Sequence, residues 1–107
     1  MRAGNIDRQV ELQSKSVKQD GYGEEIETWT RVATIWAGRK DLRGTEFFAA
    51  KQLSAEIACK WIVRYRNDIT PYASRLVYEG NTYEVLAVIE LGRREGLELM
   101  TDARVEA

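Results

Sequence analysis

The residues best suited to chemistry are two arginines that flank a tyrosine, Arg64-Tyr65-Arg66. A guanidinium group can form bidentate pairs with a carboxylate or a phosphate, so these side chains suit the binding of an acidic partner. Zinc sites and Cys-His or Ser-His dyads are excluded, because the chain has no histidine and only one cysteine, Cys59. Carboxylates are numerous, but no pair stands out. We therefore expect no catalytic, cofactor-binding or metal-ligating residue, and no enzyme.

The arginines belong to a stretch rich in β-branched and aromatic residues, which predicts a β-strand from about Ile57 to Arg66 that ends at Asn67-Asp68. Successive side chains of a strand point to opposite faces. Trp61, Val63 and Tyr65 are thus expected to face a core, and Ile62, Arg64 and Arg66 to share the other face.

Composition indicates one globular domain spanning residues 1–107. Hydrophobic residues make up 44% of the chain and charged residues 31%. The net charge of −1 argues against a general duplex-DNA binder, which needs a basic excess. There is no apolar run long enough for a signal peptide or a membrane span, so we expect a soluble protein in a reducing cytoplasm and no membrane partner.

The first third of the chain predicts a β-hairpin. Val10 and Leu12 alternate with polar residues, as in a half-buried strand. Lys18 to Gly23 contains Asp-Gly and predicts the loop, and Glu25 to Thr30 predicts the return strand. A bend or bulge is expected near Arg31-Val32, followed by a further strand through Trp36.

The rest predicts one helix and several short strands. Arg39 to Gly44 is expected to be a connection, with a helix from about Glu46 to Ala55. Gly80-Asn81 predicts a tight hairpin turn before a strand that runs to Leu91. A last strand begins at Leu97, and Ala103 to Ala107 is expected to be a loose tail.

The predicted fold is mainly β: a small antiparallel barrel or sandwich of six to seven strands, with one short helix across or inside one opening. Aromatic residues supply much of a small domain's buried area. The expected core anchors are Trp29, Trp36, Trp61 and Tyr83.

The candidate interface residues are mostly arginines. Arg64 and Arg66 are predicted to form a basic surface with Arg75, Arg93 and Arg94. Tyr22, between two glycines, could be the tip of a docking loop. In the plainer interpretation the arginines are solvated charges paired with acids of their own chain. The strand is less suited to bind single-stranded nucleic acid, because Trp61 and Tyr65 are expected on the opposite face from the arginines.

The order of motifs resembles the head–tail joining family of long-tailed phages, also called head-closure, stopper or head–tail adaptor proteins. The resemblance covers nearly the whole chain, and its most specific part is the Arg-Tyr-Arg strand with Trp-Ala upstream. The motifs, in order, are a Gly-containing leader and strand from Gly4 to Gln13, the Gly21 to Gly23 loop, Glu27-Thr28-Trp29, Trp36-Ala37, Gly44 to Phe47, Val63 to Ile69, Gly80 to Val85, and Leu97 to Leu99.

This resemblance implies a structural protein of the virion that forms a ring beneath the portal, closes or extends the DNA channel, and docks the tail. The implied partners are a portal or portal-adaptor protein, a tail-completion or tail-terminator protein, and further copies of the chain. Genomic DNA would pass through without sequence-specific binding, and the host cytoplasm would be the place of assembly. Two alternatives remain: an oligonucleotide-binding-type barrel for single strands, and a tail-completion protein.

Overall fold

The structure, a computed structural model, describes residues 6–42, 44–53, 57–102 and 104–105. It contains seven strands and one helix within these residues, which confirms the predicted mainly-β fold. In chain order the elements are β1 (Arg8–Gln19), β2 (Glu25–Asp41), α1 (Gly44–Leu53), β3 (Cys59–Arg64), β4 (Ser74–Tyr78), β5 (Asn81–Leu91), β6 (Gly96–Thr101) and β7 (Arg104–Val105).

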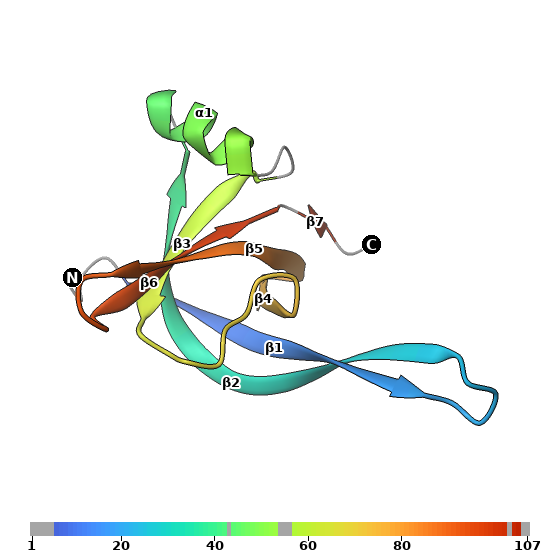
Figure 1. The fold of residues 1–107 in the computed structure, drawn as a ribbon. Helices are drawn as coiled ribbons and strands as arrows, with labels where there is room; N and C mark the ends of the chain where they lie inside the picture. The colour runs from blue at the N-terminus through green and yellow to red at the C-terminus, as the bar shows by residue number, and fades with distance from the viewer. Residues whose placement is uncertain (1–5, 43, 54–56, 103, 106–107) are drawn as a thin grey trace.

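The strands form one antiparallel sheet that closes on itself. Its order is β4-β1-β2-β3-β6-β5-β7, and an additional pairing of β4 with β5 joins the two sides into a ring of six strands. The short β7 extends the sheet beside the start of β5. Closure leaves few free strand edges in the body of the molecule (Figure 1).

Apolar side chains from every strand of the ring meet inside it. Trp61 is fully buried and packs edge-on against Tyr83 at 5.1 Å and Tyr78 at 5.8 Å between ring centroids. Trp61 and Tyr83 are therefore core anchors, as predicted. Trp36 is not: its side chain is 53% exposed. Ala33, Ile35 and Ala37 of the same strand point inward, so the alternation of β2 turns Trp36 outward.

The helix packs on the outside of the sheet. Ala50 of α1 is buried with Leu42, Ile57, Leu86 and Met100 in a second small cluster. Met100 follows the inward-facing Leu99, so it points away from the main core. The helix therefore covers the outer side of the sheet near one end, and it does not plug the opening (Figure 1).

The β1–β2 hairpin extends beyond the closed ring of strands. Leu12 pairs with Ala33 but Gln13 pairs with Arg31, so Val32 is an extra residue, and the bulge lies where the sequence predicted it. β4 pairs with β1 only as far as Ser14. Residues 16–28, which we call the arm, pair with each other and with no other strand among the described residues, and they project from the body (Figure 1).

Several predicted boundaries are wrong. Arg39 to Asp41 is the end of β2, paired with β3, and not part of a connection. The helix begins at Gly44, and its predicted end at Ala55 lies outside the described residues, as does the leader up to Asn5. Part of the expected tail is β7, since Arg104 and Val105 pair with β5; residues 103, 106 and 107 lie outside the described residues.

The tight turn lies one residue earlier than predicted. Tyr78 pairs with Asn81, so Glu79 and Gly80 are the two turn residues. Both have positive φ, 50° and 77°, as a type I′ turn requires. Gly80 was thus correctly predicted to be a turn residue, but it is the second residue of the two-residue turn and not the first.

Candidate functional site

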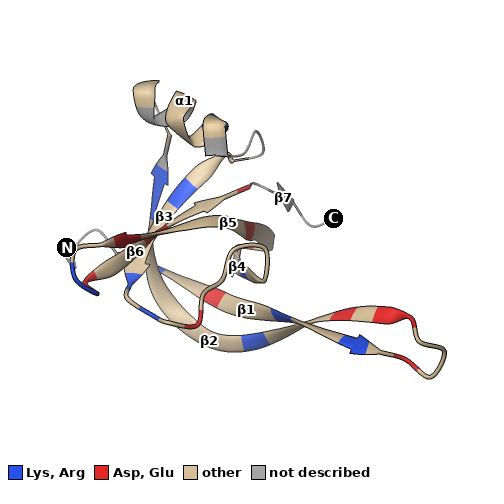
Figure 2. Cartoon of the chain, viewed as in Figure 1, with Lys and Arg blue, Asp and Glu red and all other residues tan. Residues whose placement is uncertain are grey.

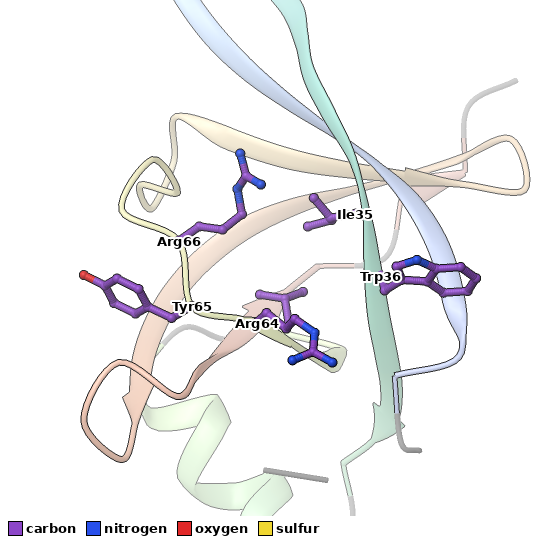
Figure 3. A pocket seen from close by; sticks show the side chains of 6 residues that line it. Ile35, Trp36, Arg64, Tyr65 and Arg66 are labelled. Atoms are coloured by element: carbon purple, nitrogen blue, oxygen red, sulfur yellow. The ribbon is translucent and has the colours of Figure 1, made fainter. Parts of the chain in front are cut away.

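An open hollow of about 340 Å³ lies where the chain leaves β3 and parts from β2. Two segments far apart in the sequence line it: Ile35, Trp36, Val63, Arg64, Tyr65 and Arg66 (Figure 3). The β2–β3 register ends with the pair Ala37–Val63, so Trp36 and Arg64 are the next residues on each strand. The hollow therefore combines an exposed indole with the predicted arginines.

The two arginines of the hollow differ in their surroundings. β3 ends at Arg64, so Arg66 does not share a strand face with it, and the two side chains point apart in Figure 3. The Arg64 side chain is exposed and makes no ion pair or hydrogen bond to any described residue. Arg64 is therefore free to bind another molecule.

Arg66 instead pairs within its own chain. Its Nε and Nη2 donate to Asp68 Oδ1 and Oδ2 at 2.9 and 2.8 Å, a bidentate pair that is partly exposed. The hydrogen bonds from Arg66 hold the pKa of the Asp68 carboxyl below its ordinary value, and the same contact raises the pKa of Arg66. In the isolated subunit, Arg66 is therefore paired with an acid of its own chain, as the plainer interpretation of the arginines expected.

The β5–β6 turn brings two more candidates beside the hollow. The guanidinium carbon of Arg94 lies over the Tyr65 ring, 5.8 Å from its centroid, and Arg93 next to it is exposed. Arg64, Arg66, Arg93 and Arg94 thus gather at one end of the molecule. This clustering comes from the topology, because β3 and β6 are neighbours and the turn precedes β6.

Arg75 is separate from this cluster. It lies on β4, with its guanidinium 4.4 Å from the centre of the Trp29 ring, and its Nε donates to Gln13 Oε1 at 2.6 Å. Trp29 is half-buried, and Lys15 lies over its ring at 5.9 Å. These contacts join β4 to both strands of the hairpin, at the point where the arm begins.

Tyr22 lies at the tip of the arm and is 96% exposed. The tip is ordered by Asp20, whose Oδ1 accepts hydrogen bonds from the backbone N–H groups of Tyr22 and Glu24 at 2.8 and 2.9 Å. Gly23 has a φ of 82°, which allows the chain to reverse. Acidic residues gather at this end of the hairpin (Figure 2).

The acidic side chains, the cysteine and the helix of the described residues bear on metal binding, thiol chemistry and membrane insertion, respectively. Within the described ranges, no group of three or more acidic, cysteine or histidine side chains lies close enough to hold a metal ion. Cys59 is buried, with its Sγ 3.1 Å from Thr101 Oγ1. No helix in the described part of the chain is long and apolar enough to cross a membrane.

One important residue of the site was misassigned from the sequence. Trp36 was expected in the core, yet it is the largest apolar side chain at the hollow. The signal was present, since Trp36 has the opposite parity from Ala33, Ile35 and Ala37. In a sheet whose inner face is buried, a residue of that parity places its side chain on the outer face, toward solvent.

Comparison with known proteins finds a matching family and solved structures of similar fold. A family model described as "Phage head completion protein" matches residues 1–104. The solution structure of protein SF1141 from Shigella flexneri 2a has a TM-score of 0.72 and 24% identity, and the match covers 96% of each chain. A chain of the virion of a native gene transfer agent particle has a TM-score of 0.67 and 19% identity, covering 94% of this chain and 96% of that chain. At such identities the two structures show a shared fold alone. No curated protein matches the chain.

Proposed function

The chain belongs to the phage head completion protein family, and on that premise we propose that it is a structural, non-enzymatic component of the virion at the head–tail junction. The observation that carries this proposal is the family match over residues 1–104. The likeness to a chain of a gene transfer agent virion supports it at the level of the fold.

We further propose that copies of the chain form a ring beneath the portal, which closes or extends the DNA channel and receives the tail. A closed ring needs two different surfaces on each subunit, because its interfaces are heterologous. The arm and the hollow are two such surfaces. Its partners would be a portal or portal-adaptor protein on the head side and a tail-completion or tail-terminator protein on the other.

The charge of the chain suits a channel through which DNA moves. A net charge of −1 supplies no general basic excess, so phosphate neutralisation would not hold the genome in place. The alternative function, binding of single-stranded nucleic acid, gains one feature from the structure: an exposed Trp36 beside an unpaired Arg64. A fluorescent oligonucleotide separates the two proposals. Tight binding that weakens with salt and is lost in Trp36→Ala would favour the alternative.

The proposed function is tested by deleting the gene from the phage or prophage that encodes it. Electron microscopy of the lysate should show heads without tails beside free tails, and the wild-type gene supplied from a plasmid should restore complete particles. Normal numbers of tailed, infectious particles in the deletion lysate would overturn the proposal.

A further inference from the structure

No other strand in the described part of the chain pairs with the arm. Residues 16–28 form a two-stranded ribbon beyond the last contact with β4, and a ribbon of this kind is marginally stable in water by itself. Four residues of β1 beyond Lys15 extend it by about 13–14 Å. Val17 and Ile26 are about half exposed, one on each face of the ribbon. Such an element would be stabilised by a surface that covers it.

Two of the acids at the tip of the arm make no ion pair with any described residue. Lys15 pairs with Glu27 at 3.6 Å, and Asp20 is occupied by the turn. Glu24 and Glu25 are exposed, and their carboxylates make no ion pair with any residue in the described ranges. Lys18 is the one cation near them on the arm (Figure 2). The tip thus presents two free carboxylates just after Tyr22, where the loop leads into β2.

The hollow has the complementary set of groups. Arg64 is free, Arg93 and Arg94 lie close by, and Trp36 supplies an exposed apolar wall. Tryptophan, tyrosine and arginine are the residues most enriched in interface hot spots. The volume of about 340 Å³ is sufficient for one aromatic side chain.

We propose that the arm of one copy docks in the hollow of the next copy, with Tyr22 entering beside Trp36 and Glu24 and Glu25 facing Arg64. This inference rests on the proposed function, because it names the contact that closes the ring. The contact is between different surfaces, so each copy offers its arm to one neighbour and its hollow to the other. It cannot form within one chain, since Tyr22 and Trp36 lie at opposite ends of the hairpin, with about 35 Å of β2 between Glu25 and Trp36.

Cysteine cross-linking in the particle tests the contact. Virions are produced with Tyr22→Cys and Trp36→Cys together, then treated with a short bis-maleimide. Both side chains are exposed, whereas the native Cys59 is buried and stays unreactive. We expect a ladder of multimers on a denaturing gel. Each single variant should give no ladder, and Tyr22→Cys with Phe48→Cys, an exposed aromatic on α1, is the matched control.

Charge reversal gives an independent readout. Arg64→Glu and Glu25→Arg should each lower the titre of infectious particles by about tenfold or more, because each places like charges together. The two changes combined should recover most of the loss. Lys40→Glu, at an exposed position of β2 outside the hollow, should have no effect.

The outcomes separate this inference from the proposed function. Particles that contain the protein but show no Tyr22–Trp36 ladder and no charge-swap recovery would overturn the arm contact and leave the virion role standing. Absence of the wild-type protein from wild-type particles would overturn both. A ladder that appears equally in the Phe48→Cys control would also overturn the specific contact.

Discussion

Trp36 of β2 and Arg64 of β3 occupy matching positions on neighbouring strands, one residue beyond the paired Ala37 and Val63, and both line the hollow. Neither side chain is needed by the core, since both are exposed. An exposed tryptophan beside an arginine that makes no ion pair with any described residue is unusual on the surface of a monomer. This relationship makes the hollow the part of the molecule best suited to an interface.

The first prediction contrasts the two tryptophans of neighbouring strands. Trp36→Ala should lower the free energy of unfolding by only about 1–2 kcal/mol, because about half of its side chain is exposed. Trp61→Ala should cost about 3–5 kcal/mol, because it empties the centre of the core. Urea unfolding of the purified variants measures both. A large loss of stability in Trp36→Ala would show that it supports the fold.

The second prediction concerns Arg75 and Trp29. Arg75→Lys keeps the charge but loses the planar stacking and the hydrogen bond to Gln13, which together contribute roughly 1–2 kcal/mol. Amide hydrogen exchange in residues 16–28 should accelerate, whereas exchange in β3 should stay slow. Arg8→Lys is the control, since Arg8 lies 6.0 Å from the Tyr78 ring, away from the arm. If both substitutions accelerated exchange in residues 16–28 equally, the Arg75–Trp29 contact would have no specific role in stabilising the arm.

The third prediction uses the Arg66–Asp68 pair. Because Asp68 has its pKa lowered in the folded state, the pair stabilises the fold above the ordinary aspartate pKa of about 4, and this stability is lost as the pH falls through the folded pKa. Asp68→Asn should therefore lower stability at pH 7 by about 1 kcal/mol or less, given the exposure of the pair. The difference from wild type should shrink below about pH 4. A difference that stays constant down to pH 3 would refute this account.

The fourth prediction addresses the turn between β4 and β5. Glu79 has a φ of 50°, a conformation that costs most side chains energy and that asparagine tolerates better. Glu79→Asn should raise the free energy of unfolding by about 0.5–1 kcal/mol. Gly80→Ala, at a φ of 77°, should lower it. Thermal melts of the two variants should shift in opposite directions, and a shift in the same direction would contradict the type I′ assignment.

The sequence predicted local pairing well where alternation and turn residues agree. The strand that contains Trp61, the bulge near Val32 and the hairpin around Gly80 follow from patterns a few residues long. Closure of the sheet, by contrast, depends on the pairing of β4 with both β1 and β5, which no local pattern specifies. The strand identity of Arg39 to Asp41 was missed for the same reason, since it depends on pairing with β3.

The candidate site was predicted in part. Arg64, Arg93 and Arg94 are exposed and Arg66 and Arg75 are partly exposed, and how they group depends on tertiary structure. Arg93 and Arg94 come next to the hollow because the β5–β6 turn lies beside β3, whereas Arg75 is placed at the base of the arm by β4. Trp36 was missed because tryptophan was assigned to the core by its type, against the parity of its strand.

The most direct measurement of the central claim is reconstitution of infectious particles. DNA-filled heads and free tails from the deletion lysate are purified, mixed, and incubated with or without the purified protein, and plaques are counted. The proposal predicts that wild-type protein restores the titre and that folded Arg64→Glu protein does so poorly. No increase in titre with folded wild-type protein, although heads and tails are intact, would contradict a role at the head–tail junction.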